Sequence, residues 1–209
     1  MTQDIASELF LLLTTASGRQ DSTQLRRHGL AAAALMELQL HERIDVEAGK
    51  NPRLRVLDPA PTGKGHLDQA LRHLVQFPEH RAKRVLSSRR VDLTDRIGDA
   101  HVAAGTLTRR NGWVAVSWRQ ADGRTEAALR ERLARALADP AGASLQDRLL
   151  WDLLRALGVA HRVMRPQIGA VTGRQLEARL ESYGAMHPIA LALRGAAQEY
   201  EATLIAATT

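Results

Sequence analysis

The chain has 209 residues, 44% of them hydrophobic, which suits a single globular domain with a sizeable core. It contains no cysteine, so a disulfide framework, a thiolate metal site and a cysteine nucleophile are excluded. Basic residues number 29 against 23 acidic ones, and all but Lys50, Lys64 and Lys83 are arginines. Arginine donates paired hydrogen bonds to phosphate, so this composition favours an anionic partner. The alternative is an arginine-rich but merely solvated surface.

The N-terminal segment resembles neither a signal peptide nor a membrane span. Its apolar run, Leu9–Leu13, is short and follows Asp4 and Glu8, where a signal peptide carries positive charge. No stretch of the sequence reaches the roughly 20 apolar residues that cross a bilayer. We therefore expect a cytoplasmic protein that is soluble or attached to a membrane from one side.

Helical periodicity dominates the first half of the chain. Within the helix predicted over Ser22–Leu40, the part Gly29–Leu40 has so few polar side chains that it is expected to be central and buried. Alternating residues at 43–47 and 53–57 predict a short hairpin. The other helices predicted here are Ile5–Thr14, Gly65–Val75, His80–Ser87 and Leu93–Ala104.

Residues 106–118 give the clearest local signal, a second hairpin. Asn111-Gly112 favours a type I′ turn that joins Thr106–Arg110 to Trp113–Trp118. Both faces of the second strand carry apolar side chains, which a ribbon on a helical body cannot bury completely. Indole rings favour the headgroup level of a bilayer, so the hairpin is predicted to insert into a membrane. The alternative is packing on the domain or on a second subunit. The predicted inserting residues are Trp113, Val114, Val116 and Trp118.

Helical periodicity returns after this hairpin, and the segment around Arg165-Pro166 is predicted to be a loop. Pro188 suits the first turn of the last helix, where its missing N–H costs nothing. Without repeats or a convincing linker, we predict one mainly α domain over residues 1–209 with one or two β-hairpins. The predicted helices in this half are Arg124–Ala138, Ser144–Leu157, Thr172–Ser182 and Pro188–Ile205.

Motifs for catalysis and metal binding are not convincing. The sequence PTGKG resembles a phosphate loop, but Asp58 replaces its first glycine and Gly65 its hydroxyl residue, so a turn before a helix is predicted. His66, His73 and His80 recur every seven residues, too far apart along one helix for a single metal ion, and are interpreted as surface residues. We predict no catalytic residue, metal or cofactor, and hence no enzyme.

A helix-turn-helix DNA-binding protein is the main rival suggested by a basic, helical chain. In the predicted helix Arg124–Ala138, however, arginines alternate with glutamates that repel phosphate. No short turn with the expected glycine precedes this helix. We therefore expect no nucleic-acid partner.

Four segments resemble the Golgi phosphoprotein 3 family in order and spacing. They are SELFLLLTTASGRQ, Gly29–Val46, PTGKGHLDQAL and His101–Trp113. The resemblance implies a mostly helical domain that binds phosphatidylinositol 4-phosphate on a basic face. It also implies a hydrophobic hairpin that enters the membrane, which corresponds here to Thr106–Trp118.

The family's head-group ligands are not preserved in this sequence. A Trp and three Arg expected from the resemblance fall on Ser22, Ala31, Val91 and Thr94, and the Asp of the PTGD segment is Lys64. Nearby arginines are predicted to form a substitute anion site, namely Arg26, Arg27, Arg89, Arg90 and Arg96.

The sequence thus predicts a peripheral protein on the cytoplasmic face of a membrane. It would bind phosphatidylinositol 4-phosphate or another anionic phospholipid through arginines and the hairpin, and a homo-oligomer is compatible with this prediction. The alternative is a non-enzymatic adaptor that kept the fold, lost the lipid site and uses the hairpin for self-association.

Overall fold

The computed structural model describes residues 4–15, 25–77, 81–111 and 116–208. These residues form ten α-helices, one 3-10 helix and two antiparallel two-stranded sheets, so the prediction of a mainly α fold is confirmed. The helices are α1 (Ile5–Leu12), α2 (Arg26–Leu40), α3 (Gly65–Gln76), α4 (Ala82–Ser87), η1 (Arg89–Val91), α5 (Thr94–Ala103), α6 (Arg124–Ala138), α7 (Leu145–Ala156), α8 (Ala160–Ile168), α9 (Gly173–Glu181) and α10 (Pro188–Thr208). The strands are β1 (Ile44–Val46), β2 (Leu54–Val56), β3 (Leu107–Asn111) and β4 (Val116–Gln120).

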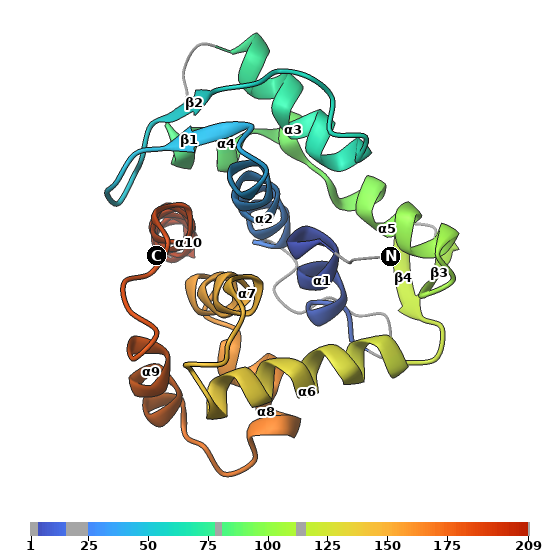
Figure 1. Cartoon of the computed structure of the whole chain (residues 1–209), viewed down its shortest axis with the longest axis vertical. Coiled ribbons are helices and arrows are strands. Elements are labelled where there is room, and N and C mark those ends of the chain that lie inside the picture. Colours follow the sequence, from blue (N-terminus) through green and yellow to red (C-terminus); the bar gives the residue numbers. More distant parts are fainter. Residues whose placement is uncertain (1–3, 16–24, 78–80, 112–115, 209) are drawn as a thin grey trace.

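Helix α2 is the centre of the molecule (Figure 1). Every residue from His28 to Leu38 is buried, and α1, α3, α4, α7 and α10 pack around it. Small side chains make this possible, because Gly29 and the four alanines that follow Leu30 let neighbouring helices approach closely. A Cβ on Gly29 would lie 3.0 Å from Leu157. The predicted burial of this helix is confirmed, with Leu40 exposed at its end.

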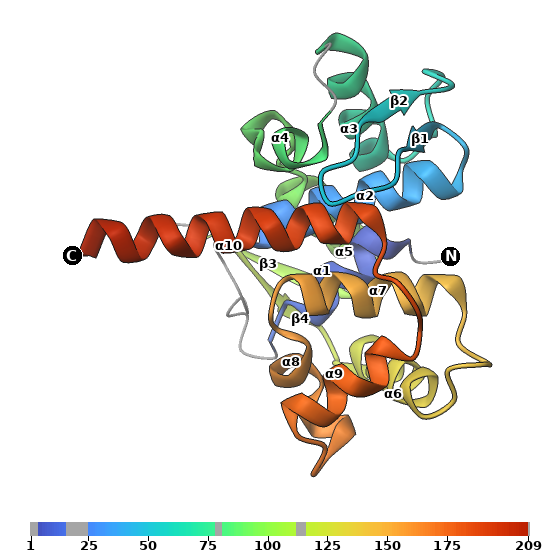
Figure 2. The same ribbon diagram turned by 90° about the vertical axis from the view of Figure 1, so that its left-hand side faces the viewer.

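Helix α10 runs alongside this centre (Figure 2). Its first half contributes Ile189, Ala190, Ala192 and Leu193 to the core, and it packs against α4, α7 and α2. Its C-terminal end extends beyond the body of the molecule (Figure 2). Within the residues that the structure describes, every helix is too short or too polar to cross a bilayer.

The predicted loop around Arg165-Pro166 is wrong, because α8 runs through both residues. Val163, Met164 and Ile168 recur at helical spacing and are buried, and α8 packs against α6 and α7. Proline removes one backbone hydrogen bond from a helix. Here the burial of an apolar face near the end of a short helix outweighs that loss.

The prediction that the spaced histidines lie on the surface is wrong for His66. Its side chain is buried, and Nε2 lies 3.3 Å from Oδ2 of Asp4, the residue that caps α1. His73 is half-buried and His80 lies outside the described residues. Of the three spaced histidines, His66 therefore lies on the inner face of α3.

The register of the second hairpin differs from the prediction. Asn111 pairs with Val116 and Arg109 with Trp118, so Asn111 belongs to β3 and the predicted two-residue turn at Asn111-Gly112 is wrong. Residues 112–115 separate the paired ends. They include Trp113 and Val114 and lie outside the described residues.

Trp118 is a core residue, so its prediction as a membrane-inserting residue is corrected. Only 2% of it is exposed, and its ring meets Phe10 edge-on at 5.4 Å between centroids. Val116 on the same strand face is partly buried against the same core. One face of the ribbon thus packs on α1 and α5. This packing buries Trp118, which the prediction of a largely exposed ribbon did not include.

Gly98 of α5 fixes how closely this hairpin approaches the domain. A Cβ there would lie 2.3 Å from Nε1 and Cε2 of Trp118. We expect Gly98→Ala to destabilise the protein by about 1–3 kcal/mol, because the rigid indole must move. This corresponds to a thermal midpoint lower by roughly 2–4 °C for each kcal/mol.

Gly173→Ala in the first turn of α9 is the matched control, since nothing lies within 4 Å of its added Cβ. Thermal unfolding followed by circular dichroism compares the two variants. Equal midpoints would contradict the close packing of the hairpin on α5.

Candidate anion-binding site

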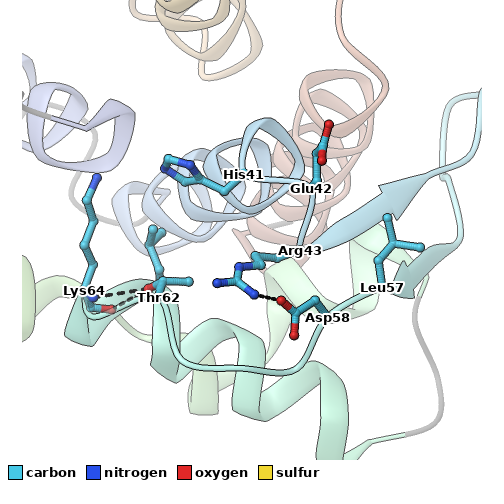
Figure 3. A pocket seen from close by; sticks show the side chains of 8 residues that line it. His41, Glu42, Arg43, Leu57, Asp58, Thr62 and Lys64 are labelled. Atoms are coloured by element: carbon cyan, nitrogen blue, oxygen red, sulfur yellow. Dashed lines mark hydrogen bonds and ion pairs between the residues drawn. The ribbon is translucent and has the colours of Figure 1, made fainter.

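Basic side chains gather at both ends of α2, and the two ends differ in how these charges are compensated. At the C-terminal end they border a pocket of about 580 Å³ (Figure 3). The pocket lies between the end of α2, the segment after β2 and the start of α3. Its lining residues are His41, Glu42, Arg43, Leu57, Asp58, Thr62, Lys64 and Leu67.

The cations of this pocket already have carboxylate partners. Arg43 forms an ion pair with Asp58, as Figure 3 shows. The Lys64 Nζ lies 3.4 Å from Glu37 Oε1 and 3.6 Å from an oxygen of Asp4. Attraction for an incoming anion is therefore cancelled locally, and this pocket is the weaker candidate.

The N-terminal end of α2 has the opposite character. Arg26 and Arg27 are its first two residues, its first turn contains no acidic residue, and no side chain of the described residues caps it. The N-terminus of a helix already carries partial positive charge. Two guanidinium groups at this position therefore produce a strongly positive end that favours an anion.

The chain between α4 and α5 brings two more arginines to this end. Arg27 Nη1 donates a hydrogen bond to the carbonyl of Ser87 at 3.1 Å, which places the end of α4 beside α2. Gln69 of α3 donates to the carbonyls of Arg90 and Asp92, both at 3.1 Å, and so holds η1 in place. Arg89 and Arg90 are exposed on η1.

Aromatic rings, rather than carboxylates, support two of these arginines. The guanidinium carbon of Arg26 lies 5.4 Å from the Phe10 centroid and 5.6 Å from the Trp118 ring. That of Arg90 lies 4.4 Å above Phe77. Such cation–π contacts contribute about 0.5–2 kcal/mol each and leave the positive charge uncancelled.

The charge of Arg26 is only partly compensated. Burial lowers the pKa of its guanidinium, and the charges of Asp92 and Asp95 oppose this shift. Neither carboxylate is close enough for an ion pair. Across the described ranges, none of the five predicted arginines forms an ion pair with a carboxylate.

Arg132 shows what a structural arginine looks like in the same protein. Its Nη1 and Nη2 donate to both carboxylate oxygens of buried Glu8 at 2.8 and 2.7 Å, and its Nε donates to Asp147 at 2.7 Å. These bonds join α1, α6 and α7. The charge of Arg132 is thus neutralised within the fold, whereas Arg26 and its neighbours form no ion pair with a described carboxylate.

Four of the five arginines predicted from sequence lie around the N-terminal end of α2 and form the arginine cluster. They are Arg26, Arg27, Arg89 and Arg90. Arg96 lies next to the start of α3 instead. Its Nη1 would be 3.4 Å from a Cβ added to Gly65. The positions implied by the family resemblance border the same region. Val91 ends η1 and Thr94 begins α5, while Ala31 is buried in α2 and Ser22 lies outside the described residues.

The aromatic supports were missed by the sequence reading. Phe10 and Phe77 are the only two phenylalanines of the chain, and each supports an arginine of this cluster. Because the chain has only two phenylalanines, both could have been singled out from the sequence as candidate supports. Which arginine each one meets depends on the tertiary packing, and no spacing in the sequence indicates it.

Comparison with known families gives one match. The family model described as Golgi phosphoprotein 3 (GPP34) matches residues 5–200, which is nearly the whole chain. No curated protein matches the sequence.

Because Arg26 and Arg132 have different partners, we expect removal of their charges to change the free energy of unfolding by different amounts. We expect Arg26→Met to change the free energy of unfolding by less than about 1 kcal/mol, because the lost ring contact is offset by relief of an uncompensated buried charge. Arg132→Met leaves Glu8 buried without its cation and is expected to cost about 2–4 kcal/mol, somewhat reduced by the partial exposure of Arg132.

Urea denaturation at neutral pH measures both variants against the wild type. If Arg26→Met were as destabilising as Arg132→Met, Arg26 would be a structural residue and the cluster would lose its central member.

Proposed function

We propose that this chain, which belongs to the Golgi phosphoprotein 3 family, binds the surface of an anionic membrane without catalysing a reaction. The observation that carries the proposal is the cluster Arg26, Arg27, Arg89 and Arg90, which has no carboxylate partner among the described residues and reaches the β3–β4 hairpin through Arg26. Arg26 touches both features, because it begins α2 and lies over the Trp118 ring of β4. We place the protein at the cytoplasmic face of that membrane.

The cluster is suited to phosphate chemistry in general. Guanidinium groups and the N–H groups of a helix N-terminus are both donors that phosphate oxygens accept. Each basic residue near an anionic surface contributes about 1 kcal/mol to binding. Four arginines without an ion-pair partner among the described residues therefore supply enough attraction for reversible membrane attachment.

The choice of lipid is expected to be loose. The positions that the resemblance assigns to phosphatidylinositol 4-phosphate ligands hold Ser22, Ala31, Val91 and Thr94, none of which carries a positive charge. The arginines proposed to replace them lie at other positions, on α2 and η1. We therefore propose recognition of anionic head groups, of which phosphatidylinositol 4-phosphate is one and phosphatidylglycerol another.

Removing two charges from η1 tests the arginine cluster. Arg89→Gln with Arg90→Gln should weaken binding to vesicles of phosphatidylcholine and phosphatidylglycerol by about 2 kcal/mol, roughly 30-fold. Binding of the wild type should also fall steeply with salt, since charges are screened within about 8 Å at physiological ionic strength. Co-sedimentation with vesicles measures both effects.

The matched control is Arg174→Gln with Arg179→Gln, two exposed arginines on α9 that give the same net charge. We expect this control to bind nearly as well as the wild type. Equal losses in both variants would mean that overall charge, not the cluster, drives binding. A strong preference for phosphatidylinositol 4-phosphate over phosphatidylglycerol at equal charge would contradict the loose specificity.

The two hairpin tryptophans are expected to respond differently to replacement. Trp113→Ala should leave the thermal midpoint nearly unchanged and weaken vesicle binding, because an interfacial indole contributes about 1–3 kcal/mol. Trp118→Ala should cost about 3–5 kcal/mol of folding stability, because it empties a core position. Thermal unfolding and vesicle co-sedimentation separate the two effects.

The same Trp113→Ala variant distinguishes the adaptor hypothesis. If the wild type binds no vesicles and the variant changes its elution size on gel filtration, the hairpin serves self-association and the membrane proposal is wrong. An unfolded Trp113→Ala variant would make Trp113 a packing residue and remove it from the proposal.

A further inference from the structure

Two buried hydrogen-bond donors near the base of the β3–β4 hairpin have no acceptor among the residues that the structure describes. They are Nη1 of Arg26 and Nε1 of Trp118, and both are enclosed by protein. The guanidinium of Arg26 lies 5.6 Å from the Trp118 ring. Buried donors are almost always paired in native proteins, so two orphans in one contact are unusual and call for an explanation.

The position of Arg26 makes it a movable group. Its guanidinium rests on the faces of Phe10 and Trp118, which hold a cation through the ring quadrupole and offer no acceptor for its N–H groups. An incoming phosphate offers several strong acceptors at once. The guanidinium therefore gains more hydrogen bonds by turning toward a phosphate than it has on the rings.

Trp118 connects this guanidinium to the hairpin and to α5. It pairs with Arg109 in the β3–β4 register, and Arg109 Nη1 donates to Asp99 of α5 at 2.8 Å. Its indole also fills the space left by the missing side chain of Gly98. Because Trp118 contacts both Arg26 and α5, a movement of Arg26 away from the ring would change how the hairpin packs on α5.

We propose that Arg26 couples the head-group site to the hairpin. When a phosphate group binds at the N-terminus of α2, Arg26 leaves the Phe10 and Trp118 rings, and the indole with its strand shifts against α5. A ligand shifts such an equilibrium only through different affinities for the two states. Here the difference is the number of Arg26 donors free to meet the phosphate. By linkage, loosening of the hairpin strengthens phosphate binding by the same factor.

This inference rests on the proposed function, and its test separates the two. The full chain is labelled with fluorotryptophan and followed by fluorine NMR, which reports its three tryptophans individually. Trp113→Phe and Trp151→Phe assign two resonances, and the remaining one belongs to Trp118. The probes are inorganic phosphate and a short-chain phosphatidylglycerol below its micelle concentration. Short-chain phosphatidylcholine, a zwitterion without net charge, is the comparison, and vesicle binding is measured in parallel.

We expect the Trp118 resonance to move as the short-chain phosphatidylglycerol saturates and to stay in place with phosphatidylcholine. Movement with inorganic phosphate as well would identify the phosphate group itself as the trigger; movement with the lipid alone would make the whole head group the trigger. Arg26→Met should abolish the shift. Arg27→Met is the matched control: it removes a neighbouring charge that bonds Ser87 instead of the rings, so it should weaken binding and keep the shift at saturation.

An unmoved Trp118 resonance at saturating lipid, with vesicle binding intact, would overturn the coupling and leave the proposed function standing. The same holds if Arg26→Met retains the full shift. Absence of binding to vesicles and to the short-chain lipid would overturn the proposed function and the coupling together.

Discussion

The burial of α2 is the constraint on which the rest of the structure depends. A 15-residue helix with His28 to Leu38 entirely buried must be covered on every side, and this requires five other helices. Only its two ends reach the surface. Both ends collect arginine, lysine or histidine, but Glu37 and Asp58 neutralise the C-terminal group, while no described carboxylate forms an ion pair with Arg26 or Arg27. The placement of cations at a helix N-terminus is unfavourable in itself. A local rule broken inside a well-packed fold is the usual mark of a functional position.

Much of this fold could be predicted because the chain is strongly periodic. Arg124–Ala138 was predicted with the bounds that the structure has, and the buried centre of α2 followed from its lack of polar residues. The failures share one cause, which is that tertiary packing overrode a local signal. Pro166 indicated a loop, but the apolar face of α8 outweighed it. Asn111-Gly112 indicated a tight turn, but Asn111 pairs with Val116 inside the β3–β4 ladder, so the turn lies further along the chain.

The candidate site was predictable in part. Arg26 and Arg27 are adjacent in sequence and so are Arg89 and Arg90, which makes the two pairs visible in the sequence, but their role as an anion site stays a prediction. The sequence does not indicate which aromatic rings contact these arginines. Phe10, Phe77 and Trp118 come from α1, the end of α3 and β4, and they approach the arginines only after those elements pack. The same limit explains why the burial of Trp118 could not be predicted, since strand alternation does not say which face of a ribbon the domain will cover.

The kind of support an arginine has decides what it can do. A carboxylate partner orients a guanidinium and cancels its charge, as Glu8 and Asp147 do for Arg132. An aromatic ring orients the guanidinium but leaves its charge in place, as Phe77 does for Arg90. A protein with many arginines therefore needs no excess of charge to build an anion site. It needs a few arginines held by rings, at a surface where the remaining ones are neutralised by carboxylates. Arg26, over Trp118 of the hairpin, and Arg90, over Phe77, have such support, and the paired cations of the pocket in Figure 3 do not.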